Sequence, residues 1–306
     1  MSSPPSECLH TEKASVTRSD IWYEDGNVVL QAESKQFRVH WSILTSQSSF
    51  FKDLQGLSQP DENQPCVDGF PVVELPDSVV DVEYLMKGLY LPTFLGQPAL
   101  PLPVIEALIR LGRKYDFRDL LDFAVARLTY ENPTTIEAYD ALLDSDRKYT
   151  PTRIVKSPGL LFDTITLAQE NGIMSVLPCA FYRILRRFET LFDHIPRNDG
   201  TLAALSSADL HRCVGPATGS CKLSSDQATP CIKIRDSRLN DYFDSLHLGA
   251  LSTFSPSAKG NRKLQLCTDY KESVRALVDG GRARMWDELP GFFELPPWDK
   301  LKLSDL

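Results

Sequence analysis

Long hydrophobic runs are missing from this sequence of 306 residues. A membrane-spanning helix needs about 20 apolar residues in a row, and the apolar stretch at 176–181 is short and already contains a proline. The first 19 residues hold prolines and charges where a secretion signal needs an apolar core. We therefore expect neither a membrane partner nor a secretion signal.

The motifs of nucleotide enzymes and hydrolases are absent as well. The sequence contains no Gly-x-Gly-x-x-Gly, no Gly-x4-Gly-Lys-Ser/Thr and no Gly-x-Ser-x-Gly. Its five histidines are scattered and form no Ser-His-Asp pattern. We therefore expect a protein without catalytic residues and without a cofactor.

Positive charge and cysteine are both limited. Acidic residues outnumber basic ones by 41 to 33, which gives a net charge of −8 and disfavours a broad phosphate-binding surface. The seven cysteines are odd in number and widely spaced, unlike the disulfide framework of a secreted domain. We expect no nucleic-acid partner and a reducing compartment, either cytoplasm or nucleus.

The composition of the chain is that of a folded, globular protein. Hydrophobic residues make up 42% of it, and its length suggests two domains. Residues 1–18 are polar and contain prolines, so we expect a flexible N-terminal arm. The pattern then divides into residues 19–131, with short strands and helices, and residues 132–306, which are predominantly helical.

Residues 19–131 begin with a hairpin signal. Asp25-Gly26 lies between the apolar triplets 21–23 and 28–30, which predicts that these two strands pair with each other. The elements expected after this hairpin are a strand at 37–40, helices from 41 and at 50–54, a loop at 56–69, a strand at 71–76, a helix from 79 to 89, an irregular proline-rich segment at 91–103, and two helices that end near Asn132-Pro133.

Residues 132–306 show helical periodicity with few strand signals. The expected helices lie at 135–143, at 160–170 with a left-handed cap at 171–172, after Pro178, after the capping box at 206–209, at 237–248 and at 263–278, before Gly280-Gly281. Arg183, Arg186 and Arg187 share one helix face, which we interpret as solvated although it could also touch phosphates. The aromatic tail at 285–301 is expected to dock on this helical half.

Several residues of the first part occur in the order of a known family. Asp20 lies early in the first strand, His40 ends a strand, Leu44 follows four residues later, and Ser48 precedes Phe51 by three. A helix ending at Tyr90 and a block around Tyr115 match further along. Together they resemble the BTB/POZ family. The resemblance implies an α+β fold, a small sheet capped by helices, in which these seven residues have structural roles.

The resemblance also implies a function in protein–protein interaction and self-association, as an adaptor or scaffold. Members commonly form homodimers through the N-terminal segment and first helix, where this chain has Asp20, Ile21, Trp22 and Trp41. A cullin-type scaffold is a further partner in the family, but its acidic-hydrophobic motif is not visible in residues 55–69. The second half is similar to the C-terminal helical extension of BTB proteins in fungi.

Other readings of single residues stay open at this point. His40 could be catalytic or structural, and Asp20 could be an interface charge or could order the first strand. Four late cysteines could form a zinc site, and the alternative function would then be zinc-dependent DNA binding or transcription regulation. Their spacing lacks a Cys-x2-Cys pair, so we expect ordinary buried thiols and no metal. The cysteines concerned are Cys213, Cys221, Cys231 and Cys267.

Overall fold

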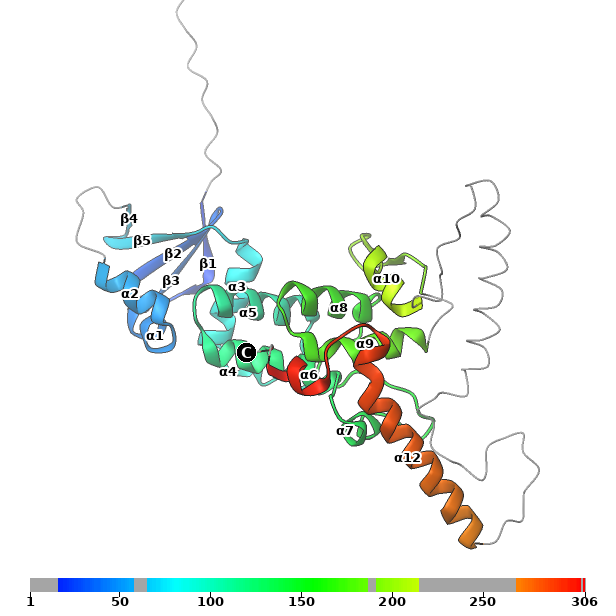
Figure 1. Cartoon of the computed structure of the whole chain (residues 1–306). Coiled ribbons are helices and arrows are strands. Elements are labelled where there is room, and N and C mark those ends of the chain that lie inside the picture. The colour runs from blue at the N-terminus through cyan, green and yellow to red at the C-terminus, as the bar shows by residue number, and fades with distance from the viewer. Residues whose placement is uncertain (1–15, 58–64, 187–190, 215–267, 304, 306) are drawn as a thin grey trace, which may run out of the picture. The chain divides into compact units, whose positions relative to one another are not determined.

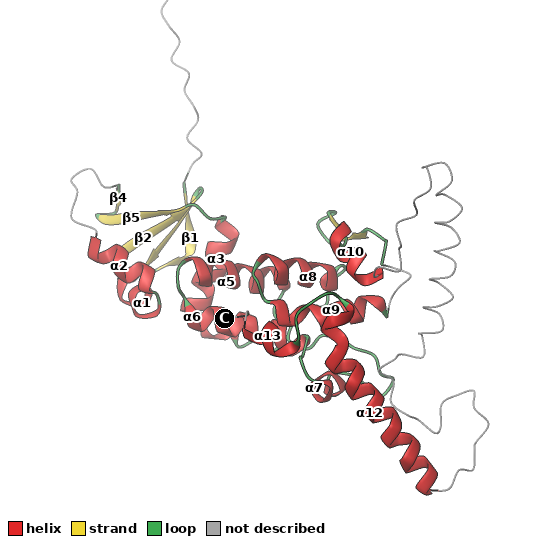
Figure 2. Cartoon of the chain, viewed as in Figure 1, coloured by secondary structure: helices red, strands yellow, loops and turns green. Residues whose placement is uncertain are grey.

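The computed structural model describes residues 16–57, 65–186, 191–214, 268–303 and 305. The chain divides into two compact units, Met1–Ala124 and Val125–Leu306. Figure 2 shows that the larger sheet belongs to the first unit, while the second is mostly helical. The α+β class and the helical second part are therefore confirmed.

The first unit contains a mixed five-stranded sheet with the order β1-β3-β2-β5-β4. Strand β1 runs parallel to β3, β2 is antiparallel to β3 and parallel to β5, and β4 is antiparallel to β5. The strands are β1 (Thr17–Trp22), β2 (Val28–Ala32), β3 (Lys35–Val39), β4 (Cys66–Val67) and β5 (Phe70–Leu75).

The expected hairpin between the first two strands is wrong. Strand β3 lies between β1 and β2, and the hairpin joins β2 to β3 through Glu33, whose φ is 49°. The segment at 23–27 closes onto β3: the Tyr23 N–H donates to the Arg38 carbonyl at 3.0 Å, and the Asn27 N–H donates to the Val39 carbonyl at 2.9 Å. A Cβ on Gly26 would lie 2.9 Å from that Val39 oxygen. Gly26 thus lies in the connection that passes β3 from β1 to β2, and it is not part of a hairpin turn.

Among the described residues of the first unit, five α-helices lie wholly within it. They are α1 (Trp41–Gln47), α2 (Ser49–Leu57), α3 (Val79–Tyr90), α4 (Pro92–Leu95) and α5 (Leu102–Lys114). Figure 1 shows α1 beside α2 and α3 beside α5, and both pairs are in contact. The prediction of an irregular segment throughout 91–103 is wrong, because α4 forms within it. Pro92 is tolerated at the first helical position, where its missing N–H removes no hydrogen bond of the helix. The prediction of a loop at 56–69 is likewise wrong at Cys66–Val67, which form strand β4.

The helix α6 (Arg118–Glu131) ends before Pro133, as the sequence predicts. The second unit continues with α7 (Ile136–Ala141), α8 (Leu160–Glu170), the 3-10 turn η1 (Met174–Val176), α9 (Leu177–Leu185), α10 (Ser207–Val214), α12 (Thr268–Phe292) and α13 (Trp298–Leu303). A two-stranded hairpin, β6 (Ile195–Pro196) with β7 (Leu202–Ala203), interrupts the expected all-helical pattern. The helix expected at 237–248 lies outside the described residues.

The last long helix does not stop before Gly280-Gly281. Helix α12 runs through both glycines to Phe292, with Pro290 near its end. Two glycines cost the helix about 2 kcal/mol, whereas burial of Arg282, Trp286 and Leu289 beyond them holds its C-terminal half against the second unit. Within the described residues, no helix is long and apolar enough to cross a membrane.

Candidate interaction site

Strand β1 holds three of the four residues expected at an interface. Its burial alternates: Asp20 is exposed, Ile21 is buried, and Trp22 is half-buried beneath the guanidinium of Arg18, whose Cζ lies 4.4 Å from the ring centroid. The fourth residue, Trp41 of α1, is also buried. Asp20 and Trp22 are therefore the accessible members of the set.

The outer edge of β1 is open in the part of the chain that the structure describes. The strand is last in the sheet order and pairs only with β3. Such an edge presents unpaired N–H and C=O groups, which can bond to a strand of another chain. The site thus combines a backbone edge with one aromatic and one acidic side chain.

His40 lies between β3 and α1, at the N-cap position of α1, and belongs to an aromatic cluster. Its backbone N–H donates to the Tyr90 hydroxyl at 2.8 Å, and its Nε2 lies 3.2 Å from the Asp25 carboxylate. The Tyr23 ring lies 5.4 Å from His40 and 4.9 Å from Tyr90, measured between centroids. Burial raises the pKa of Tyr90 to about 12, so its hydroxyl stays protonated at neutral pH. These described partners include no serine or cysteine, so the cluster orders the strand end and does not form a nucleophile–base pair.

Ser48 joins the start of α2 to Tyr115. Its Oγ accepts the Phe51 N–H at 3.0 Å and donates to the Tyr115 carbonyl at 2.5 Å. Phe51 and Leu44 are completely buried. The Tyr115 hydroxyl donates to Asp77, and burial, followed by this bond, raises the pKa of Tyr115 above its ordinary value. Leu44, Ser48, Phe51 and Tyr115 are buried in the first unit and Asp77 is half-buried, and the bonds of Ser48 hold the start of α2 against Tyr115.

The family model of the BTB/POZ domain matches residues 23–132. The chain contains a BTB/POZ domain. A search of the curated proteins finds no match to the chain. BTB/POZ domains are in general protein-interaction and self-association domains without enzymatic activity.

Two polar residues order the BTB/POZ domain through contacts that sequence reasoning missed. The Asn27 side chain accepts the Trp41 N–H at 2.8 Å and so caps α1. Asp77 accepts from Tyr115 and from Lys114 Nζ, the latter at 2.7 Å. All three contacts join residues 14 or more positions apart, and no local pattern signals such pairs.

The alternative zinc site has one ligand among the described residues. Cys213 is buried in α10, and burial together with the nearby Asp209 charge raises its thiol pKa to about 12, which disfavours the thiolate that zinc requires. Cys221, Cys231 and Cys267 lie outside the described residues. Within the described ranges, no three His, Cys, Asp or Glu side chains are grouped to hold a metal ion.

The expectation that Arg183 lies on a solvated helix face is wrong. Its side chain is 4% exposed, and its NH1 donates to the Glu131 carbonyl and, at 3.3 Å, to the Asn132 side chain. Its guanidinium carbon lies 3.5 Å from the centroid of the Tyr149 ring. Arg186 is exposed but bonds to the Tyr139 hydroxyl at 3.4 Å, and Arg187 lies outside the described residues. Arg183 is thus a core residue of the second unit and is not available for phosphates.

Proposed function

We propose that this protein is an adaptor or scaffold that forms homodimers through β1 of its BTB/POZ domain. The observation that carries the proposal is the open edge of β1, with Asp20 and Trp22 accessible along it. In a two-fold dimer, the same surface of each copy meets its counterpart. An edge strand suits this arrangement because its backbone groups can pair across the axis.

Trp22 supplies the apolar part of the proposed interface. Aromatic residues are enriched at the cores of interfaces. The exposed remainder of its half-buried ring contributes about 1–2 kcal/mol per copy when covered, at about 25 cal/mol per Å2. The rest of the affinity has to come from backbone pairing and neighbouring side chains, which makes the dimer sensitive to a charge at this position.

Light scattering on the full chain tests the proposal. The expected particle mass is twice the 34.4 kDa of one chain, and Trp22→Glu should return it to the mass of one chain. Val80→Glu, on the exposed surface of α3, is the matched control and should remain dimeric. A wild-type protein that stays monomeric at micromolar concentration would contradict the proposal.

The described cysteines support a reducing compartment, cytoplasm or nucleus. Cys179 and Cys213 are buried and form no disulfide in the structure. Cysteines outside disulfides are ordinary in a reducing environment, whereas secreted domains commonly pair theirs. Fluorescence microscopy of the tagged full chain tests this assignment, and accumulation in the secretory pathway would contradict it.

A further inference from the structure

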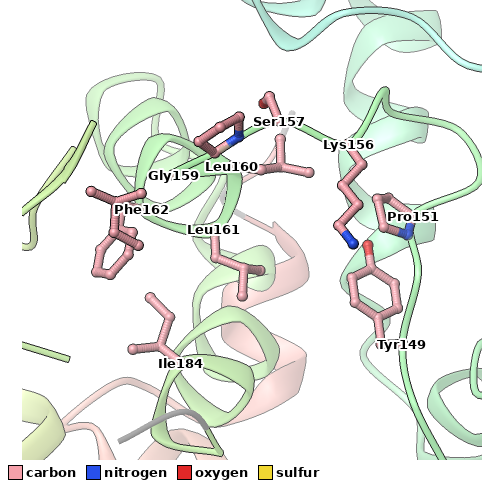
Figure 3. A pocket seen from close by; sticks show the side chains of 11 residues that line it. Tyr149, Pro151, Lys156, Ser157, Gly159, Leu160, Leu161, Phe162 and Ile184 are labelled. Carbon is pink, nitrogen blue, oxygen red and sulfur yellow. The ribbon is translucent and has the colours of Figure 1, made fainter. Parts of the chain in front are cut away.

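The second unit contains an open cavity of about 460 Å3. In Figure 3, Leu161 of α8 and Ile184 of α9 lie on one side of it, and Tyr149, Pro151 and Lys156 lie on the other. The volume falls within the range of about 300–1,000 Å3 typical of ligand sites. The walls are predominantly apolar, so the cavity favours an apolar side chain over a polar one.

The wall opposite α8 is formed by the loop at 149–156, which hydrogen bonds to Glu131 hold in place. The buried carboxylate of Glu131 accepts the Tyr149 hydroxyl at 2.7 Å, the Thr152 N–H at 2.8 Å and the Arg153 N–H at 2.5 Å. The Tyr149 ring is in turn backed by the guanidinium of Arg183. The loop is therefore preorganised, and a ligand would not have to order it.

The part of this loop that lines the cavity, residues 149–159, carries only positive charge, whereas Asp144 and Asp146 precede it in the loop. Residues 147–162 include four basic and no acidic residues, in a chain whose net charge is −8. Arg147 is paired with Asp140, and Arg153 stacks on Tyr130. Lys148 and Lys156 are exposed and have no ion-pair partner among the described residues. Lys156 lines the cavity itself.

We propose that this cavity binds an acidic segment of a partner protein, which inserts one apolar side chain between α8 and the loop and places carboxylates near Lys156. An extended segment fits better than a small acid for two reasons. The free positive charges are spread along the loop, with Lys148 next to one lining residue and Lys156 at another. Exposed Val155 directly precedes Lys156 and offers a further apolar contact.

This site belongs to the second unit and the β1 edge to the first, so the proposal extends the proposed function without depending on dimer formation. Apolar anchoring sets the affinity, while the lysines select acidic over basic segments. Binding should weaken as salt screens the charges.

A peptide array probed with the full chain tests the proposal. The peptides are about nine residues long, long enough to flank one anchor side chain. Their central residue is varied among apolar and polar types, and their flanks are either Asp/Glu or Lys/Arg. Acidic-flanked peptides with an apolar centre should bind, and those with basic flanks or a serine centre should not.

Variants of the cavity separate this site from other surfaces. Lys156→Glu should weaken binding of the best peptide about tenfold or more, as expected when one charge partner is reversed, and Lys156→Arg should retain it. Leu161→Trp, which fills the cavity, should abolish binding. Lys300→Glu on α13 is the matched charge control, and Trp22→Glu should bind as wild type even if it alters the oligomeric state.

Three results would overturn the proposal. The first is an array in which no acidic, apolar-centred peptide binds, and the second is binding that survives both Lys156→Glu and Leu161→Trp. The third is a titration in which the fatty acid dodecanoate binds in the cavity while no peptide binds. That result would make the cavity a small-molecule site. Thermal melts of each variant establish that lost binding does not reflect unfolding.

Discussion

Glu131 is the buried carboxylate that orders residues 149–153 of the second unit. It is 1% exposed, and its carboxylate accepts hydrogen bonds from the backbone N–H groups of Thr152 and Arg153 and from the Tyr149 hydroxyl. Removing an acceptor from buried donors costs the desolvation of each donor left unpaired.

We therefore expect Glu131→Ala to lower the free energy of unfolding by about 3 kcal/mol. Glu131→Gln should cost less, because an amide oxygen can still accept. Urea unfolding of the full chain followed by circular dichroism measures both, and exposed Glu137→Ala is the control. Equal stability of the alanine variant and wild type would show that water replaces the carboxylate.

Tyr90 makes the stability of the BTB/POZ domain depend on pH in the alkaline range. Its pKa is raised from 10.0 to about 12, first by burial. A raised folded-state pKa means that the folded state holds its proton more tightly than the unfolded state. The contribution is complete below pH 10 and is lost as the pH rises towards 12.

The free energy of unfolding of the wild type should accordingly fall between pH 10 and pH 12. That of Tyr90→Phe should fall less steeply with pH. Burial also raises the pKa values of Tyr115 and Tyr149. In Tyr90→Phe the dependence of the free energy of unfolding on pH is therefore weaker but still present. Denaturant titrations at several pH values measure the slope. The control Tyr130→Phe, at an exposed tyrosine, should show the same change of the free energy of unfolding with pH as the wild type. If Tyr90→Phe also shows the wild-type change, Tyr90 does not cause the pH dependence.

At the scale of elements, the C-terminal half of α12 is fixed by its aromatic residues. Trp286 is 2% exposed, donates through Nε1 to the Thr134 carbonyl at 3.0 Å and stacks on Trp298, with ring centroids 5.7 Å apart. Arg282 adds an ion pair with Asp140, in which its Nη2 lies 2.7 Å from each carboxylate oxygen. This part of the chain is therefore integral to the second unit.

Truncation after Gly281 should lower the melting temperature of the protein, and Trp286→Ala alone should cost about 3–5 kcal/mol, as is usual for buried tryptophan. Phe292→Ala is the matched control, because this aromatic residue of the same helix is 56% exposed. Differential scanning calorimetry measures all three. An unchanged melt on truncation would mean that the tail contributes nothing to stability.

At the scale of the whole molecule, dimer formation links stability to concentration. A partner that binds only the folded state raises its apparent stability by mass action. The melting temperature of the full chain should rise with protein concentration, whereas that of Trp22→Glu should not. A wild-type melting temperature that stays constant between low and high micromolar concentration would argue against a dimer linked to folding.

Local signals determined most of the elements, because helix caps and prolines act on the backbone within a few residues. Ser48 and Ser78 cap helices, α6 ends before Pro133 as expected, and Pro178 lies in the first turn of α9. The ordered positions His40, Ser48, Phe51 and Tyr115 indicated the BTB/POZ domain, which the family model confirms.

Contacts between distant residues decided the rest. The Asp25-Gly26 turn had the composition of a hairpin, yet β3 separates the strands on either side of it, because strand pairing satisfies backbone groups along whole strands and outweighs one turn. Arg183 had the periodicity of a solvated face, yet Glu131, Asn132 and Tyr149 surround it from positions 34 to 52 residues away. Sequence alone determined the domain type and most local elements, whereas strand order, buried charge and the cavity were decided by tertiary packing, since each depends on residues that only the fold brings together.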